Sequence, residues 1–260
     1  MKNLIKFNCE NGVAYLILNR PEVYNSFNRK MALTLQKLLD NCDADENIRA
    51  VVLTGNGKAF CAGQDLKEVT DPMLNPGFKT ILNEHYEPII KKLRALKKPV
   101  IAAVNGVAAG AGANIAMACD IIVAKENASF IQAFSSIGLI PDCGGTYFLP
   151  RLVGFQKAQA LALLGDKILA NEAEKMGMIY KVIPSDNFVN EVQALAIKLS
   201  KMPTKALGMI KELFNASMQH TLSEQLTLET KFQIEASESE DYAEGVNAFI
   251  EKRTPTFKGK

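Results

Sequence analysis

Hydrophobic residues follow two alternating patterns along the first half of the chain. Some runs are apolar throughout, which is typical of strands in a sheet that is covered on both faces; they lie at 13–18, 49–54, 100–104 and 121–124. Between them, apolar residues recur at helical spacing in 31–39, 89–96 and 114–119. This alternation predicts an α/β fold.

The second half of the chain is mainly helical in pattern. We expect a helix over 156–164, a strand over 177–183 that ends at Pro184, and helices from Asn187 to about Lys252. This change divides the chain into a core, 1–186, and a C-terminal helical region, 187–260. One stretch, 69–77, contains Pro and Gly without periodicity and is predicted to be a loop of the kind that often covers a binding site.

Composition narrows the class of protein. The 260 residues are 48% hydrophobic, enough for a large core, and 30 basic residues are interspersed with 28 acidic ones, so we expect no nucleic-acid or membrane partner. Five scattered cysteines without a C-x-x-C pair indicate a reducing compartment. His85 and His220 lack metal-ligand spacing, so we expect no metal site. No long apolar segment opens the chain, and we expect a cytoplasmic protein.

Two short stretches carry the candidate chemistry. The small residues of 107–114 lead from a predicted strand into a predicted helix, where unpaired N–H groups could stabilise negative charge on an oxygen. On pattern alone, Gly110 and Gly112 favour close packing between helix and sheet over an active site. The second stretch places Asp142 between a proline and two glycines, on a predicted tight turn before a helix, where an aspartate can also serve as a turn or capping residue.

Other candidates have ordinary explanations. Cys61 and Cys143 have no histidine nearby in the sequence and are predicted to be small core residues. Asn114, in the first turn of a predicted helix, can cap it or form local hydrogen bonds. The glycine-rich run lacks the Lys-Ser/Thr of a phosphate-binding loop and the spaced glycines of a dinucleotide-binding fold, and no Gly-x-Ser-x-Gly motif occurs.

Four motifs, in order along the chain, resemble the crotonase (enoyl-CoA hydratase/isomerase) superfamily: KAFCAGQDLKE (58–68), KPVIAAVNGVAAGAG (98–112), CDIIVA (119–124) and IPDCGGT (140–146). The resemblance implies a spiral of repeated ββα units with a C-terminal helical region that packs on neighbouring subunits, in a homotrimer or a dimer of trimers. It also implies an acyl-CoA thioester substrate. Coenzyme A would enter as part of that substrate, with no permanently bound cofactor.

The resemblance further implies the site residues. The backbone N–H groups of Gln64 and Ala111 would hold the thioester oxygen. Residues implied to line the CoA and thioester path are Ala62, Gly63, Asp65, Leu66 and Gly110, with Phe232 and Lys252 near the nucleotide end.

The departures from the family pattern bear on the reaction. Hydratases of the family use two glutamates to activate water, and the corresponding residues here are Asn114 and Phe134, which cannot act as general bases. Asp142 is then the remaining carboxylate. We expect it to move a proton between two carbons, with Asn114 contacting substrate and with Phe134 and Ile137 lining the acyl pocket.

Within the family the motifs most resemble the ring-epoxide isomerases of phenylacetate catabolism, which rearrange a ring epoxide beside a CoA thioester and also shift double bonds. The expected function is therefore an acyl-CoA isomerase acting through an enolate. The alternatives are an enoyl-CoA hydratase, a non-catalytic acyl-CoA-binding subunit, an RNA-binding relative, against which the balanced charge speaks, and a hydrolytic or dehalogenating relative in which Asp142 attacks covalently.

Overall fold

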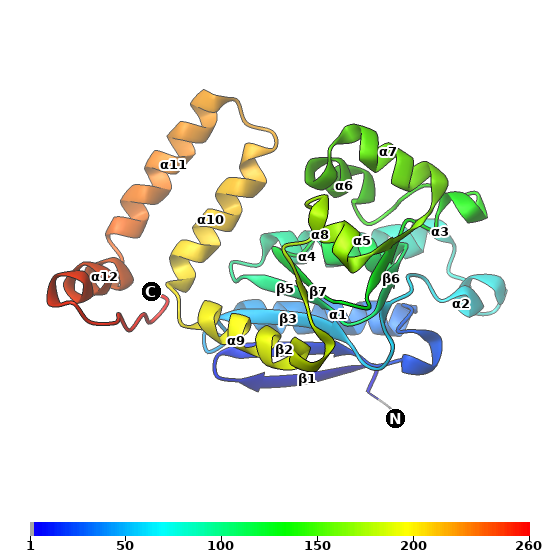
Figure 1. Ribbon diagram of the computed structural model, residues 1–260, viewed down its shortest axis with the longest axis horizontal. Coiled ribbons are helices and arrows are strands. Elements are labelled where there is room, and N and C mark those ends of the chain that lie inside the picture. The colour runs from blue at the N-terminus through cyan, green and yellow to red at the C-terminus, as the bar shows by residue number, and fades with distance from the viewer. Residues whose placement is uncertain (1–2) are drawn as a thin grey trace.

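Two β-sheets form the centre of the computed structural model, which describes residues 3–260 (Figure 1). One sheet has the strand order β1 (Ile5–Glu10), β2 (Val13–Leu18), β3 (Ala50–Gly55), β5 (Val100–Val104), β7 (Ile121–Lys125) and β10 (Lys181–Ile183). The other has the order β4 (Ala59–Cys61), β6 (Val107–Ala109), β8 (Ser129–Ile131) and β9 (Lys167–Leu169). Neighbours pair in parallel except β1 with β2 and β8 with β9. The α/β class is confirmed.

Helices connect and cover the strands. They are α1 (Arg29–Ala44), α2 (Leu66–Thr70), α3 (Phe78–Thr80), α4 (Glu87–Ala95), α5 (Ala111–Met117), α6 (Gly145–Val153), α7 (Phe155–Leu164), α8 (Ala170–Lys175), α9 (Phe188–Ser200), α10 (Thr204–Ser217), α11 (Leu222–Ser237) and α12 (Glu240–Glu251). A π-helix, Ile81–Tyr86, joins α3 to α4, and 3-10 turns lie at Pro21–Val23, Ser135–Ile137 and Ser185–Asn187. Within residues 3–260, none of the helices has the length and hydropathy that crossing a membrane requires.

The fully apolar runs form β2, β3, β5 and β7, as predicted. The predicted strand over 177–183 forms only as β10, because Gly177 has a positive φ of 80° and the chain turns there. The strands of the smaller sheet were not predicted. Each has three residues, which is too short for an alternation of apolar and polar side chains to be recognised. The predicted loop 69–77 starts inside α2 and is otherwise free of helix and strand.

Two hydrophobic clusters cover the larger sheet on opposite faces. One joins α1, α4 and α5 to the sheet through residues such as Leu35, Leu93 and Leu53. The other joins Val13 and Val52 to α9. The packing therefore keeps α9 with the sheet, so the sheet-bearing unit ends later than the predicted boundary at residue 186; residues 1 and 2 of the predicted 1–186 core lie outside the described chain.

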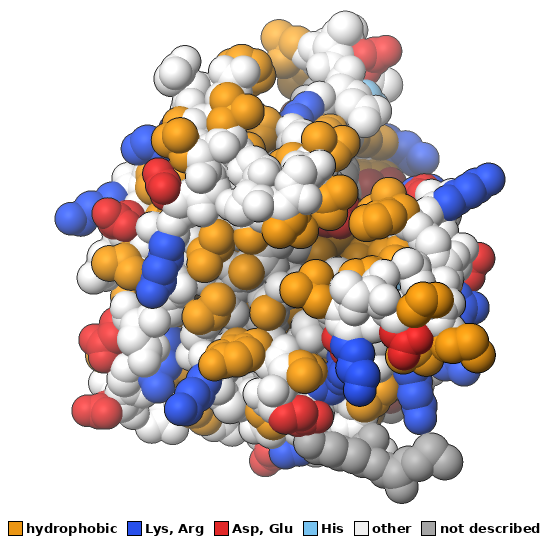
Figure 2. Space-filling view, turned by 90° about the vertical axis from the view of Figure 1, so that its right-hand side faces the viewer, with side chains coloured by type: hydrophobic (Ala, Val, Ile, Leu, Met, Phe, Trp, Pro, Cys, Tyr) orange, Lys and Arg blue, Asp and Glu red, His pale blue; other side chains and the backbone are white. Residues whose placement is uncertain are grey.

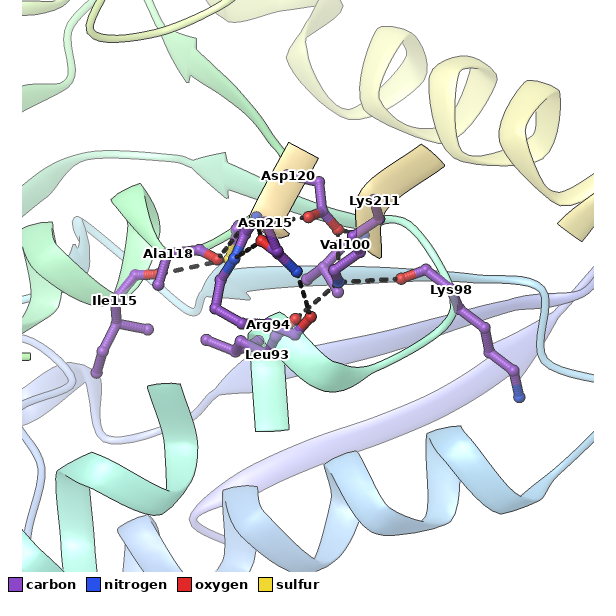
Figure 3. A network of polar contacts seen from close by, with 10 residues as sticks. Leu93, Arg94, Lys98, Val100, Ile115, Ala118, Asp120, Lys211 and Asn215 are labelled. Atoms are coloured by element: carbon purple, nitrogen blue, oxygen red, sulfur yellow. Dashed lines mark hydrogen bonds and ion pairs between the residues drawn. The ribbon is translucent and has the colours of Figure 1, made fainter. Parts of the chain in front are cut away.

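Helix α10 is fastened to the sheet by a buried polar network (Figure 3). Lys211 is almost fully buried, and its ammonium pairs with Asp120 at 2.8 Å and donates to the carbonyl oxygen of Leu93 at 2.7 Å. Arg94 donates to Asn215 and to Asp120, and Asn215 donates back to the carbonyl oxygen of Arg94 at 3.0 Å. Beyond this anchor, α11 and α12 stand apart from the sheets (Figure 1).

Replacing Lys211 by Met keeps the aliphatic stem and removes the ammonium. We expect the free energy of unfolding to fall by about 3 kcal/mol, because a buried ion pair and carbonyl acceptors lose their partner. Urea unfolding measures the change. The matched control on the same helix is Lys205→Met, whose ion pair with Glu235 is exposed and should contribute less than about 1 kcal/mol. Equal effects of the two substitutions would contradict the role of the network.

Candidate active site

Two backbone N–H groups from distant segments lie on adjoining turns. Around Gln64, the amide of Phe27 donates to the carbonyl of Gly63 at 2.7 Å and the amide of Asp65 donates to the carbonyl of Phe27 at 2.8 Å. The N–H of Gln64 shares a trans peptide group with the carbonyl of Gly63, and the two point in opposite directions, so this N–H points away from Phe27. A methyl group placed on Gly63 would lie 3.3 Å from the amide nitrogen of Ala111, which puts this turn directly against the start of α5.

The backbone of the small-residue run opens α5 with an unusual conformation. Gly110 has φ 53° and ψ −128°, which L-residues with a side chain rarely adopt, and the amide of Ala111 follows it. Within residues 3–260, neither this N–H nor that of Gln64 finds an acceptor. Two unpaired donors beside one another are the arrangement that stabilises an anionic oxygen.

Close packing and site geometry coexist in this run. A methyl group on Gly112 would lie 2.3 Å from the carbonyl oxygen of Cys61, so glycine is needed for α5 to approach β4. The packing explanation therefore holds for Gly112. The thiol of Cys61 is fully buried beneath this contact, and burial raises its pKa to about 12, as the core assignment predicts.

Asp142 lies on the predicted turn. The amide of Gly145, the first residue of α6, donates to the carbonyl of Asp142 at 2.8 Å, and the two central residues, Cys143 and Gly144, have φ of 51° and 74°, as in a type I′ turn. Within residues 3–260, the Oδ1 atom of the Asp142 side chain is buried without a hydrogen-bond partner. Burial raises the pKa of this carboxyl, and a hydrogen bond from the Cys143 thiol partly opposes the rise.

Asn114 has a different role from the expected one. Its side chain has no exposed surface; Nδ2 donates to the carbonyl of Asp142 at 2.8 Å, and Oδ1 accepts from Gln132 at 2.8 Å. The expectation of contact with substrate is corrected, because both ends of the amide are occupied inside the protein. Instead, Asn114 ties the Asp142 turn to α5, one turn after Ala111.

The ring of Phe134 borders the same space. It is buried, and a methyl group on Gly110 would lie 3.7 Å from its Cζ atom. Ile137, three residues on, is 63% exposed. Figure 2 shows a hollow with mostly hydrophobic walls on the face that carries α2 and α3, and acidic side chains are visible inside it.

The segment 62–66 divides between exposed and structural residues. Ala62 and Leu66 are exposed, and Gly63 is buried against α5. The side chain of Asp65 is not free, because it caps α2 by accepting from the amide of Lys67 and pairs with Arg20 at 2.7 Å. A ligand along this segment would meet the backbone of Asp65 rather than its carboxylate.

Phe232 and Lys252 do not reach this site within one chain. Phe232 is buried on α11, where its neighbours belong to α10 and α11, and Lys252 ends α12 in a left-handed conformation. Both helices lie on the opposite side of the molecule from α2 and α3 (Figure 1). Their expected contact with CoA stays a prediction, because the structure describes one chain and no neighbouring copy.

Sequence reasoning missed two polar residues at the site. The hydroxyl of Tyr86 donates to Oε1 of Gln64 at 2.9 Å, and Nε2 of Gln64 donates to Glu68 at 2.9 Å. Tyr86 lies in a stretch of helical appearance, where a tyrosine is expected to belong to the core, so no local signal could have found it.

Residues 3–260 contain no group of three or more His, Cys, Asp or Glu side chains placed to hold a metal ion.

Comparison with known proteins places the chain among relatives of one family. A family model described as enoyl-CoA hydratase/isomerase matches residues 8–260. The chain is 46% identical over 264 residues to the 1,2-epoxyphenylacetyl-CoA isomerase of Escherichia coli K12, covering all of both chains, and 44% identical to a probable enoyl-CoA hydratase of Rhodobacter capsulatus, covering 98% of each. A crystal structure of a putative enoyl-CoA hydratase/isomerase from Mycobacterium abscessus superposes with a TM-score of 0.92 at 34% identity, over 98% of this chain and 100% of the other.

Replacing Asn114 by Ala removes the link between α5 and the Asp142 turn. We expect the free energy of unfolding to fall by about 2–4 kcal/mol, because Gln132 and the Asp142 carbonyl lose partners inside the core and a small cavity remains. Asn75→Ala is the control. That side chain also makes two hydrogen bonds but is exposed, and its loss should cost less than about 1 kcal/mol. Comparable losses in chemical denaturation would refute the buried link.

Proposed function

The chain belongs to the enoyl-CoA hydratase/isomerase family, whose members act on CoA thioesters, and from that premise we propose that it is an acyl-CoA isomerase with Asp142 as its base. The observation that carries the proposal is the buried Oδ1 of Asp142, which has no hydrogen-bond partner in the described part of the chain, 3–260. Asn114 holds the backbone carbonyl of the same residue and so ties its turn to the helix that begins with Ala111. A desolvated carboxylate with an open acceptor is suited to taking a proton from carbon.

In the proposed reaction, the thioester oxygen of a 3-enoyl-CoA accepts hydrogen bonds from the amides of Gln64 and Ala111. Ionised Asp142 removes a proton from C2, and the electron pair of that C–H bond delocalises to give a dienolate with its negative charge on the thioester oxygen. The protonated Asp142 then returns the proton to C4, which leaves a 2-enoyl-CoA. Nothing is added or lost overall, and one donor of such an anion site is worth about 3 kcal/mol of barrier.

Asn114 and Phe134 favour isomerisation over hydration. They occupy the positions that correspond to the two water-activating glutamates of the family's hydratases. The side-chain amide of Asn114 is hydrogen-bonded to Gln132 and to the carbonyl of Asp142, and the Phe134 ring is buried beside Gly110. Neither group can activate water, and an apolar wall keeps water from competing for the enolate.

We extend the proposal to a substrate whose acyl group carries a ring epoxide. Its support is the 46% identity to an enzyme named as a 1,2-epoxyphenylacetyl-CoA isomerase, together with the aromatic wall that Phe134 provides. The alternative is an enoyl-CoA hydratase, the printed name of the relative at 44% identity.

We also propose a homotrimer or a dimer of trimers. Exposed hydrophobic side chains along the C-terminal helices support an interface there: Ile210, Phe214, Leu222, Leu226, Ile234, Tyr242, Val246, Phe249 and Ile250. In such an assembly, any contact of Phe232 or Lys252 with CoA would be made to the site of a neighbouring copy.

Replacing Asp142 by Asn should lower turnover of a 3-enoyl-CoA at least 100-fold, because the isosteric amide cannot accept the proton. CoA-ester affinity should change little, since the two backbone donors remain. The melting temperature should not fall at neutral pH, because burial raises the pKa of Asp142 and ionising this carboxyl therefore costs the folded state more than the unfolded one. Steady-state kinetics, calorimetric titration and thermal unfolding measure the three quantities, and wild-type turnover in this variant would remove Asp142 from the reaction.

Hydration of crotonyl-CoA should be negligible beside isomerisation of a 3-enoyl-CoA. The physical reason is that water has no second carboxylate at Asn114 or Phe134 to activate it. Loss of the conjugated enoyl absorption on incubation with crotonyl-CoA reports hydration. A rate comparable to that of isomerisation would establish the hydratase alternative.

A further inference from the structure

Tyr86 is placed to act on the Gln64 segment through both its ring and its hydroxyl. It ends the π-helix Ile81–Tyr86, and its side chain is 1% exposed. The ring packs edge-on against Phe27, with centroids 6.1 Å apart and planes at 67°. Phe27 is the residue whose backbone brackets Gln64 with hydrogen bonds to Gly63 and Asp65.

The side-chain amide of Gln64 is held at both ends. Its Oε1 accepts from the hydroxyl of Tyr86, and its Nε2 donates to Oε2 of Glu68. The other oxygen of Glu68 accepts from the amide of Arg29 at the start of α1, at 2.8 Å. The chain of bonds therefore connects the π-helix, the Gln64 turn, α2 and α1.

The hydroxyl of Tyr86 remains a hydrogen-bond donor across the working pH range. Burial raises its pKa well above the ordinary value, and the nearby thiol of Cys143 and carboxyl of Asp142 add to the rise. The phenol donates to the side chain of Gln64, and the charge of the Asp142 turn acts on it. It is neutral, buried and aimed at Gln64, and the proton transfers proposed above do not use it.

We propose that Tyr86 is a positioning residue that orients the backbone N–H of Gln64 toward the thioester oxygen by clamping the Gln64 side chain. The inference rests on the proposed function, because it assigns the Gln64 amide to the oxyanion. Removing the hydroxyl leaves Oε1 of Gln64 without its donor, so the side chain can turn and the peptide group is held only by its backbone hydrogen bonds to Phe27. A donor that stabilises developing charge loses much of its effect when it is misaligned.

The test compares Tyr86→Phe, Gln64→Leu and the double variant in the full-length enzyme. Phenylalanine keeps the ring against Phe27, and leucine keeps the backbone N–H of residue 64. Each single variant should lower kcat for 3-enoyl-CoA isomerisation about 10-fold with KM changed less than 3-fold, and the double variant should match Gln64→Leu alone. Tyr180→Phe is the control, since the Tyr180 side chain is 69% exposed and outside the site.

A spectroscopic readout separates positioning from loss of stability. A conjugated aryl-acryloyl-CoA absorbs at longer wavelength when donors polarise its thioester carbonyl, so the red shift of the bound ligand should shrink in Tyr86→Phe and stay unchanged in Tyr180→Phe. An unchanged red shift and kcat in Tyr86→Phe, or losses that add in the double variant, would overturn the role of Tyr86. The proposed function has its own test: turnover retained in Asp142→Asn would contradict it. No result with the Tyr86 variants alone would do so, and the two failures are therefore distinguishable.

Discussion

The close approach of α5 to β4 is the constraint on which the site depends. Only a glycine at position 112 allows the backbone of α5 to lie against Cys61, and the turn at Gly63 then lies so close that a methyl group on it would be 3.3 Å from the amide nitrogen of Ala111. Two segments that are nearly fifty residues apart in the sequence thereby lie against one another, and among residues 3–260 the N–H groups of Gln64 and Ala111 have no acceptor. A side chain at either glycine would separate them, so packing and the capacity to hold an anionic oxygen have the same physical origin.

Polar burial then fixes the second half of the site. Asn114 is fully buried, and its amide finds two partners, so the cost of its desolvation is met by hydrogen bonds that also hold the Asp142 turn. Asp142 differs, because one of its carboxylate oxygens is buried without a hydrogen-bond partner among the described residues 3–260. The amide of Asn114, whose two ends are hydrogen-bonded, thus holds in place the turn of Asp142, whose carboxylate keeps a free acceptor oxygen.

The C-terminal helices α10, α11 and α12 are attached to the rest of the chain through polar contacts of α10. The network of Arg94, Asp120, Lys211 and Asn215 fastens α10 to the end of the sheet, while α11 and α12 extend away from it (Figure 3). Through the bond from Arg94 to the carbonyl oxygen of Ala118, this anchor reaches the C-terminal end of α5, whereas the Ala111 amide lies at the N-terminal end of that helix. Helices α11 and α12, whose residues the family pattern associates with CoA, lie on the opposite side of the molecule from α2 and α3 (Figure 1).

The sequence by itself determined the α/β class, the four apolar strands and the turn at Asp142, because each depends on residues that are adjacent or a few positions apart. The four motifs and their order along the chain also resembled the family that the comparisons then established. Only the tertiary structure decided that Asn114 supports Asp142 instead of touching substrate, that Tyr86 and Glu68 hold Gln64, and that Phe232 and Lys252 lie elsewhere. These facts depend on hydrogen bonds and distances between segments whose relative position is set by packing, and no local pattern of residues records where a side chain finds its partner.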